Sequence, residues 1–588
     1  MSLTTVRNLW RSGILGLAAG HTAIACQQQS MNTDGLNYLT LGRAFWSGDP
    51  ASAISGIWSP LYGVLAAGAI ALVDPPIDWV FPTVQIVNFL IFAVSLLCFE
   101  RLWSELLGSE GETNSKATPR VSPDGQGAGS GATALWWSIG YGLFLWGGLN
   151  LIEIWAVTPD MLVAALVYLA AAAMVRIGAG RGTWRTQAWL GATLGVGYLA
   201  KAPLFPLGLV ALGLTALTAA RLSDGIRRSI PAVVAFALVA GPLVTATSVR
   251  AGRPAFSEVG RFTYLKHVNR IPFPHWRDGE VDGVGVPTHL SGKVHADPDA
   301  YVWEGPVAGP YPPSTDPDYW TEGLSPRIDL FQQLNEVGNG LAFYFTLFFR
   351  TQGPLVGIAA LILAGGFLSG VRPRIRQGAW HLTAWAVACF AMYSLVFVTH
   401  RYVAPFVLLF WAGLFGTLRS YARHLPTPHL AAAGGLVVLF TGVNILALNV
   451  EGATALLGFR PPVEVEARGQ FAGSGGAGGT PPAVAAGLLD AGFVTGDDIA
   501  YIGNSYTAFW AFLVNARIVG EIWPEEADAF WALPSARRED ILAHFRSVGA
   551  TWIVAGAVPV GETPTGSWTR LGSTGYWGRP LTDEQQNR

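Results

Sequence analysis

The sequence contains little charge. Of its 588 residues only 13% are charged, whereas 51% are hydrophobic. An ordinary soluble domain has about 25% charged residues, so this balance excludes a soluble globular protein and predicts an integral membrane protein. The formal net charge is −2, and the basic residues are dispersed singly between apolar runs. This distribution excludes nucleic acid as a partner.

Cysteine is also scarce. Cys26, Cys98 and Cys389 are the only three, and all fall in or beside apolar segments without metal-ligand spacing. The sequence therefore predicts neither a disulfide framework nor a cysteine-bound metal. The C-terminal segment 481–588 contains no phosphate-loop or dinucleotide motif. Residues 9–27 are not followed by a convincing cleavage pattern, so we interpret them as a retained first membrane span.

Long apolar runs are what the sequence has in abundance. Runs of roughly 17–22 residues are long enough to cross a bilayer. They occur near residues 9–27, 80–99, 134–152, 161–177, 187–200, 202–220, 229–248, 353–371, 379–398, 403–418 and 428–449. The sequence thus predicts a polytopic α-helical membrane protein with about eleven spans.

The side on which each loop lies depends on residues 58–73, which are also apolar. If this segment only enters the membrane interface, every short basic cluster faces the cytoplasm, as the positive-inside rule requires. These clusters are Arg7 with Arg11, Arg101 to Arg120, Arg176 to Arg185, Arg221 to Arg228, Arg372 to Arg376 and Arg419 to Arg423. The outer side then receives residues 28–79, the turn at 153–160, the turn at Lys201, residues 249–352, the turn at 399–402 and residues 450–588.

The domain organisation follows from these assignments. Residues 1–449 form a membrane domain with a first external loop at 28–79 and a large external loop at 249–352. The latter is rich in aromatic residues and proline, which predicts an ordered cap over a site. Residues 104–133 read as a flexible linker and 450–480 as a glycine-rich linker. Residues 481–588 predict a small α/β domain with buried strands at 498–503 and 551–556 and a helix at 535–547, which we interpret as accessory.

Asp34 is the first candidate functional residue. Apolar residues recur at helical spacing over 31–46, with Asn37, Thr40 and Arg43 on the other face, which predicts an amphipathic interfacial helix. Asp34 lies at or just before the start of this helix. It either caps the helix or provides a carboxylate for chemistry.

Three further charged residues stand at the predicted outer ends of spans. Asp160 follows Thr158 and Pro159, a good helix start with Thr158 as the cap. Lys201 interrupts a long apolar run, so it either extends to the interface or binds an anion. Arg401 lies outside, against the bias of the other arginines, which indicates a role such as holding phosphate.

The order of these features resembles the GT-C membrane glycosyltransferases, in particular bacterial relatives of protein O-mannosyltransferases and lipid A aminoarabinose transferases. The matching motifs cover residues 1–420. They are Asp34-Gly35-Leu36-Asn37-Tyr38, Ser59-Pro60-Leu61-Tyr62, Thr158-Pro159-Asp160, Leu199-Ala200-Lys201-Ala202-Pro203 and Arg401-Tyr402-Val403-Ala404-Pro405. The resemblance implies transfer of a sugar from a polyprenyl-phosphate donor to an acceptor hydroxyl at the outer side of the cytoplasmic membrane. The acceptor would be a glycan, a lipid or a protein.

The same resemblance implies roles for individual residues. Asp34 would take the acceptor proton, and Asp160 would orient the acceptor or help Asp34 hold Mg²⁺ or Mn²⁺, which prefer oxygen ligands. The donor phosphate would be bound by Lys201, Arg401 and Tyr402. Four residues would line the substrate loops: Tyr38, Tyr62, Glu153 and His400. Some relatives use a metal and others do not, and the first loop here has Asp34-Gly35 in place of two adjacent acids.

Two other classes of function remain open from sequence. A transporter or flippase for a lipid-linked or anionic solute would also place charges at membrane depth. However, no inverted repeat is visible, and the unusual polar residues gather on one predicted face. A non-catalytic anchor for the C-terminal domain would explain neither Lys201 nor the long aromatic loop.

Overall fold

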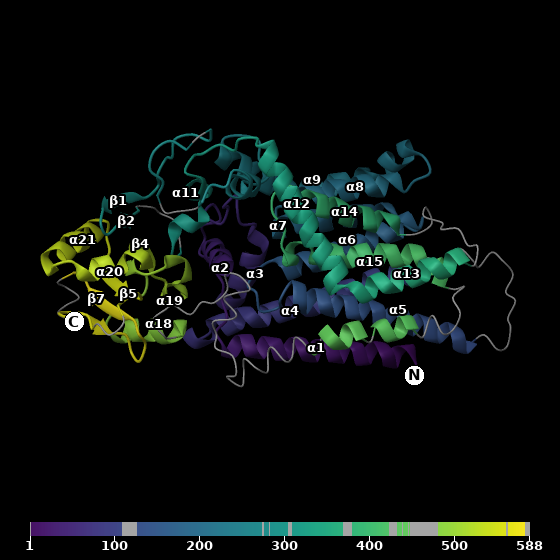
Figure 1. The fold of residues 1–588 in the computed structure, drawn as a ribbon, viewed down its shortest axis with the longest axis horizontal. Coiled ribbons are helices and arrows are strands. Elements are labelled where there is room, and N and C mark those ends of the chain that lie inside the picture. The colour runs from purple at the N-terminus through teal and green to yellow at the C-terminus, as the bar shows by residue number, and fades with distance from the viewer. Residues whose placement is uncertain are drawn as a thin grey trace.

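Helices form an elongated bundle, and an α/β domain stands at one end of it (Figure 1). The computed structural model describes residues 2–108, 126–272, 276–281, 283–303, 309–368, 379–422, 432–437, 439–444, 446, 480–559 and 563–582. The N-terminus lies at the end of the bundle far from the α/β domain.

The long helices of the bundle run along its length. They are α1 (Leu3–Gln27), α4 (Val80–Gly108), α5 (Gln126–Trp146), α6 (Asp160–Gly178), α7 (Trp184–Ala200), α8 (Leu204–Leu217), α9 (Leu222–Ala251), α13 (Gly353–Leu368), α14 (Trp380–Ser394) and α15 (His400–Ala422). Other elements connect them: α2 (Thr33–Trp46), α3 (Pro60–Val73), η1 (Ile77–Trp79), η2 (Gly147–Leu151), α10 (Val259–Thr263), η3 (Tyr264–Val268), η4 (Pro312–Thr315), α11 (Pro317–Thr321), α12 (Leu330–Phe345) and η5 (Thr346–Thr351).

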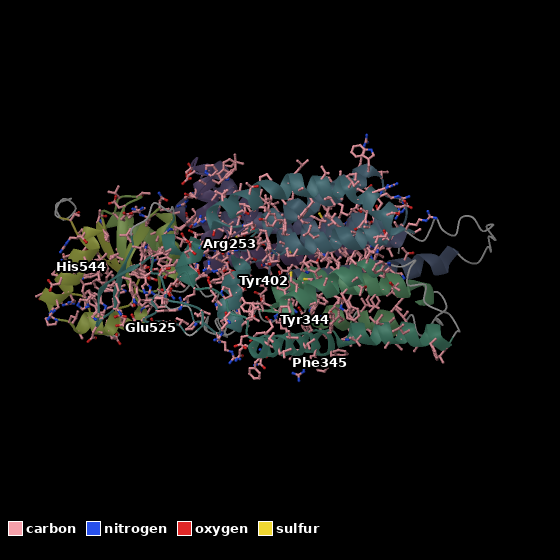
Figure 2. All side chains as sticks on the ribbon, turned by 90° about the horizontal axis from the view of Figure 1, so that it is seen from above. Arg253, Tyr344, Phe345, Tyr402, Glu525 and His544 are labelled. Atoms are coloured by element: carbon pink, nitrogen blue, oxygen red, sulfur yellow. The ribbon has the colours of Figure 1, made fainter. Side chains whose placement is uncertain are left out.

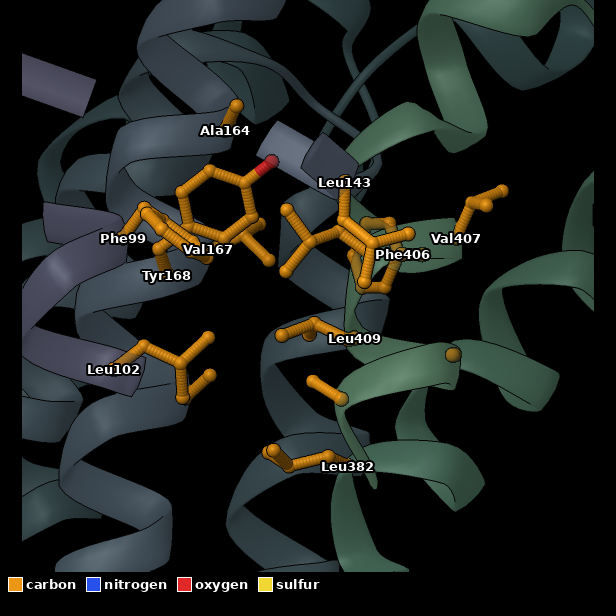
Figure 3. Close-up of a cluster of buried hydrophobic side chains, with 14 of the residues drawn as sticks. Phe99, Leu102, Leu143, Ala164, Val167, Tyr168, Leu382, Phe406, Val407 and Leu409 are labelled. Atoms are coloured by element: carbon orange, nitrogen blue, oxygen red, sulfur yellow. The ribbon is translucent and has the colours of Figure 1, made fainter. Parts of the chain in front are cut away.

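The core of the bundle is apolar and well packed. Phe99 of α4, Tyr168 of α6 and Phe406 of α15 meet there with side chains that are almost fully buried (Figure 3). The outer faces are apolar as well, and α9 exposes large residues such as Leu238 and Val249. A bundle that is apolar on both its inner and outer faces is typical of a protein surrounded by lipid.

The number of spans differs from the prediction. Among the described residues, four helices are long and apolar enough to cross a membrane: Ile77–Gly108, Asp160–Gly178, Leu222–Ala251 and His400–Leu418. Leu330–Thr351 and Gly353–Leu368, bent by 78°, add a fifth if they form one span. Eleven spans are therefore not confirmed, because several predicted runs form helices such as α7 and α8, of 17 and 14 residues. About 20 residues are needed for a straight crossing.

Helices α2 and α3 pack against each other at the end of the bundle nearest the α/β domain (Figure 1). Their backbones touch where Gly42 faces Gly63, because a Cβ atom on Gly42 would lie 2.1 Å from the Gly63 carbonyl oxygen. The helix predicted at 31–46 is present as α2, but it does not bury one face alone as an amphipathic interfacial helix would. Asn37 and Thr40 are buried along with the apolar face, since residues of the segment 309–315 cover them.

The α/β domain is built on a seven-stranded sheet with the order β1-β2-β4-β3-β5-β7-β6. Its strands are β1 (Gly292–His295), β2 (Ala300–Val302), β3 (Asp498–Ile502), β4 (Arg517–Ile522), β5 (Trp552–Ala555), β6 (Thr569–Arg570) and β7 (Trp577–Pro580). Strand β3 runs parallel to β4 and β5, and the strands predicted at 498–503 and 551–556 are confirmed as β3 and β5. Strand β2, which lies in the segment 249–352, pairs antiparallel with β4, so this segment and the C-terminal segment share one sheet.

Helices cover both faces of this sheet. The helices are α18 (Pro481–Asp490), α19 (Phe509–Leu513), α20 (Pro524–Ala532) and α21 (Ser535–Ser547). Alternate residues of β3 point to opposite faces, so Tyr501 packs with α18 and α19, whereas Ile502 packs with α20 and α21. The predicted helix at 535–547 is therefore confirmed.

The two predicted linkers are only partly described. Helix α4 continues to Gly108 and α5 begins at Gln126, so the linker at 104–133 is shorter than predicted. Residues 109–125 and most of the linker at 450–480 lie outside the described residues, as does much of the last predicted span, 428–449.

Candidate active site

Asp34 lies in the first turn of α2 and points toward the start of α15. Its Oδ2 accepts a hydrogen bond of 2.6 Å from Arg401 Nη2, and its side chain is 28% exposed. Asn32 occupies the N-cap position. The capping alternative for Asp34 is therefore wrong, and its carboxylate faces a guanidinium group instead.

Asp160 is the first residue of α6 and is almost fully buried, with its side chain 2% exposed. Its Oδ1 accepts a hydrogen bond from Lys201 Nζ, and its Oδ2 lies 3.7 Å from Arg401 Nε. Asp160 thus contacts both cations. Thr158 does not cap α6 as predicted, because Pro159 occupies the N-cap position and Thr158 Oγ1 has no hydrogen-bond partner.

The backbone places both cations at helix ends. Lys201 lies in the break between α7 and α8. Its own extended backbone ends α7, and Pro203 precedes α8. Arg401 lies in the first turn of α15. Two carboxylates and two cations give this group of four no net charge, which limits the cost of its burial. We call Asp34, Asp160, Lys201 and Arg401 the charged quartet.

Tyr402 completes the cation side of the quartet. Lys201 Nζ lies 3.8 Å from the centre of its ring, and the Arg401 guanidinium lies 5.3 Å from it. An aromatic face at this distance attracts a cation and helps fix its position. Figure 2 shows Tyr402 near the junction of the helical bundle with the outer domain.

Tyr38 and Tyr62 lie behind Asp34. Their rings meet edge to face at 5.5 Å, and Tyr62 donates a hydrogen bond of 2.7 Å to Asn88. Burial, and then the nearby carboxylates of Asp34 and Asp160, raises the pKa of Tyr38 well above its usual range. Tyr38 is therefore neutral across the physiological range and stands close to both acids.

A hydrogen-bonded frame connects the starts of α2 and α6. Gln85 and Asn88 of α4 and Asn32 at the N-cap of α2 bind the backbone of the turn before Asp160. Gln85 also binds the backbone of the first loop. The bonds are Gln85 Nε2 to the carbonyl oxygens of Ser30 at 2.9 Å and Trp155 at 3.0 Å, Asn88 Nδ2 to that of Ala156 at 3.2 Å, and the Val157 N–H to Asn32 Oδ1 at 2.9 Å. This frame holds the two acids at a fixed spacing.

Glycine at position 35 allows α2 to pack closely against the turn before Asp160. A Cβ atom at this position would lie 2.6 Å from Val157 Cβ, a distance that real side chains do not tolerate. The residue after Asp34 is therefore glycine because the first turn of α2 lies directly against the turn that leads to Asp160.

Two other predicted residues lie at the margin of the quartet. The exposed ring of His400 lies 4.7 Å from the Phe343 ring of α12. Glu153 is partly buried in the turn before α6, with left-handed backbone at φ 62°.

Sequence reasoning missed several residues of the site. Gln85 and Asn88 stand out as amides inside an apolar run, and that signal was available. Lys266 of η3 is a third cation near Asp34: burial lowers its pKa, and the charge of Asp34 opposes that shift. Nothing in its surrounding sequence indicated this position.

The acids do not form an evident metal site. Among the described residues, no group of three or more His, Cys, Asp or Glu side chains could hold a metal ion. Arg401 lies against both carboxylates, and Lys201 lies against Asp160. The donor set therefore does not fit Mg²⁺ or Mn²⁺ in this arrangement, and we derive no step through a metal.

Comparison with known proteins shows similarity at the level of structure alone. No family model and no curated protein matches the chain. The solved structure of ArnT from Cupriavidus metallidurans in the apo state superposes with a TM-score of 0.50 at 13% identity, covering 98% of this chain and 99% of that one. The same protein bound to undecaprenyl phosphate gives 0.49 at 13% identity, with the same coverage. The oligosaccharyltransferase of Archaeoglobus fulgidus in the apo form gives 0.46 at 10% identity, covering 93% of this chain and 69% of that one.

The likeness to apo ArnT extends over nearly the whole of both chains. It confirms, at the level of fold alone, the resemblance that the sequence motifs indicated. Together with the apolar helices, it supports a location in a membrane.

Proposed function

We propose that this protein is a membrane glycosyltransferase. It moves a hexosyl or pentosyl group from a polyprenyl-phosphate donor to an acceptor hydroxyl at the outer side of the cytoplasmic membrane. The observation that carries this proposal is the charged quartet, in which a partly exposed carboxylate and two fixed cations meet at one end of a lipid-facing bundle. The acceptor is a glycan, a lipid or a protein.

The members of the charged quartet have different roles in the transfer. Arg401 and Lys201 bind the donor phosphate, on which negative charge grows as its bond to the anomeric carbon breaks. Asp34 accepts the proton of the acceptor hydroxyl as its oxygen bonds to the anomeric carbon. The products are the glycosylated acceptor and the polyprenyl phosphate, and the proton on Asp34 then leaves to water.

Asp160 has a different role from Asp34 under this proposal. It is inaccessible, and it binds Lys201 while lying close to Arg401. Asp160 is therefore a positioning residue that holds both cations toward the phosphate. Asp34 is the more exposed acid, and an incoming phosphate competes with it for Arg401, which releases Asp34 Oδ2 to accept a proton.

The likeness of fold to ArnT supports a polyprenyl phosphate as the carrier of the sugar. ArnT, whose apo structure shares this fold, also has a structure described as bound to undecaprenyl phosphate. A donor of that chemistry suits a site at the end of an apolar bundle, because its tail remains in lipid while its phosphate reaches Arg401 and Lys201.

The proposal is tested by Asp34→Asn. Asparagine is close in size but cannot take a proton, so turnover of a polyprenyl-phosphate sugar should fall by about 10²–10⁴ while the thermal midpoint changes little. Asp49→Asn is the matched control, because Asp49 is an exposed acid of the same loop whose carboxylate accepts hydrogen bonds from Ser52, three residues along the chain. Turnover of Asp34→Asn equal to that of the control would remove Asp34 as the base.

A further inference from the structure

A second group of charges lies at the end of the bundle opposite the quartet. It comprises five arginines and two glutamates from α1, α4, α6 and the turn after α6: Arg7, Arg11, Arg101, Arg176, Arg181, Glu100 and Glu105. We call it the distal arginine cluster. Arg176 lies roughly 24 Å along α6 from Asp160, at 1.5 Å per residue, so the cluster is remote from the candidate active site.

Glu105 is the centre of one half of the cluster. It is 6% exposed and pairs with Arg101 at 2.8 Å, Arg176 at 3.2 Å and Arg181 at 2.9 Å. One carboxylate cannot neutralise three guanidinium groups. Arg101 is also the most exposed member of the cluster, with 58% of its side chain accessible.

Glu100 is the centre of the other half. Its carboxylate receives two hydrogen bonds from Arg11, at 2.6 and 2.5 Å, and one from the Tyr141 hydroxyl at 2.5 Å. Arg7 lies 3.6 Å away and stacks over the Trp137 ring at 4.2 Å. The whole cluster, with five positive and two negative charges, carries a surplus of three positive charges.

An apolar stripe leads along α4 to Arg101. Leu90, Val94 and Leu97 are 56%, 52% and 62% exposed and recur at helical spacing with Arg101. They therefore lie on one outward face that ends at the arginine. Trp184, 67% exposed at the start of α7, belongs to the same end of the bundle, and tryptophan is typical of the depth where lipid headgroups begin.

We propose that the Glu105 half of the cluster is a binding site for an anionic phospholipid. Arg101 and Arg176 hold the headgroup phosphate through their planar forks, and an acyl chain lies on the stripe of Leu90, Val94 and Leu97. The surplus of positive charge among the described residues favours an anion, and the apolar stripe beside it favours a hydrophobic tail. A soluble phosphate would leave that stripe unused, so one lipid molecule satisfies both features.

The test measures retention of dioleoyl phosphatidylglycerol by the detergent-purified full chain, using native mass spectrometry, with dioleoyl phosphatidylcholine as the neutral lipid. Arg101→Gln and Arg176→Gln should each weaken phosphatidylglycerol binding about fivefold and leave phosphatidylcholine binding unchanged. The control is Arg546→Gln, because Arg546 is a partly exposed arginine of the C-terminal domain that lies 3.8 Å from Glu539. Equal phosphatidylglycerol binding by wild type and the two cluster variants would overturn the proposal.

A second variant distinguishes a lipid-binding role of the cluster from a purely structural one. Glu105→Gln removes the central negative charge and keeps the shape, so phosphatidylglycerol binding should increase. A purely structural ion-pair cluster would lose stability with no gain in lipid. The last measurement compares thermal stabilisation of the protein by inorganic phosphate with that by phosphatidylglycerol. Equal stabilisation would identify a site for a free anion and overturn the lipid assignment.

Discussion

At the residue scale, Arg401 is the centre of the candidate active site. It is the one member of the charged quartet that lies against both carboxylates, at 2.6 Å from Asp34 and 3.7 Å from Asp160. A planar guanidinium can bind two oxygens at once, so Arg401 can hold a phosphate without leaving Asp160. Lysine at position 201 supplies a point charge, which the ring of Tyr402 fixes from the other side.

The two cations can be tested separately from the base. Lys201→Met and Arg401→Gln keep most of the side-chain length but remove the charge, so donor affinity should fall by about 10- to 100-fold, the loss expected for a charged hydrogen bond. Binding of the polyprenyl-phosphate donor measures this. Arg250→Gln, which removes an outer cation paired with Asp316, should bind the donor normally. Unchanged donor affinity in both site variants would remove these residues from the phosphate site.

At the element scale, the contact between α2 and the turn before α6 sets the spacing of the two acids. Gly35→Ala would place a Cβ atom 2.6 Å from Val157 Cβ. Overpacking of this kind typically costs about 1–3 kcal/mol, and misplacing the acids by 1 Å would lower turnover by about 10²-fold. Steady-state turnover and the thermal midpoint measure the two effects. Gly20→Ala on α1 is the control, because a Cβ atom there meets open space and should leave turnover unchanged.

The π-helix η3 predicts a pH dependence of stability. Burial, and then the charge of Lys266, lowers the pKa of His267 from 6.5 to about 4. Between these values the unfolded chain binds more protons than the folded protein, so stability falls as the pH falls from 6.5 toward 4. Because His267 is partly exposed, solvent screening reduces the loss to about 1 kcal/mol.

His267→Phe removes this titration and keeps an aromatic ring against Phe397, with which His267 stacks at 4.3 Å. The thermal midpoint of the wild type should therefore drop further than that of the variant between pH 7 and pH 5. Parallel pH profiles of the two proteins would show that His267 does not titrate in this way.

Local pattern predicted the local structure well. The helix at the first loop, the break at Lys201 and the strands β3 and β5 all follow from periodicity and from proline or glycine positions. Patterns within a single segment were less reliable for burial. Residues 31–46 were predicted to form an amphipathic interfacial helix with Asn37 on its polar face, but Asn37 is buried and accepts a hydrogen bond from Ser314, which lies far along the chain.

At the scale of the whole molecule, the parts that sequence did not predict are those that depend on distant pairings. Asp34 and Arg401 were both candidates, yet one was assigned to the acceptor and the other to the phosphate, and their direct ion pair was not foreseen. Pairing of β2 with β4 was also missed, because strands of three and six residues give no sign of their partners. Both results depend on tertiary contacts that no local pattern encodes.

The same long-range packing changes the prediction for the C-terminal domain. Arg43 of α2 donates hydrogen bonds of 3.0 Å to the Phe512 carbonyl oxygen and to Asn515 Oδ1, and its guanidinium lies 3.5 Å from the centre of the Phe512 ring. Burial lowers the pKa of Arg43 to about 10. The helix that carries Asp34 is thus attached to the domain that sequence analysis interpreted as accessory.

Arg43→Met tests whether the C-terminal domain is accessory or holds α2, and with it Asp34, in place. Methionine fills the same space over the ring but cannot donate to α19 and its flanking turn, so α2 loses its attachment while removal of a desolvated charge offsets part of the lost stability. Turnover should fall about tenfold through misplacement of Asp34, with a small change in thermal midpoint. Arg538→Met is the matched control, because Arg538 also lies over an aromatic ring, that of Trp531 at 5.8 Å, within the same domain. Equal turnover in both variants would return the C-terminal domain to an accessory role.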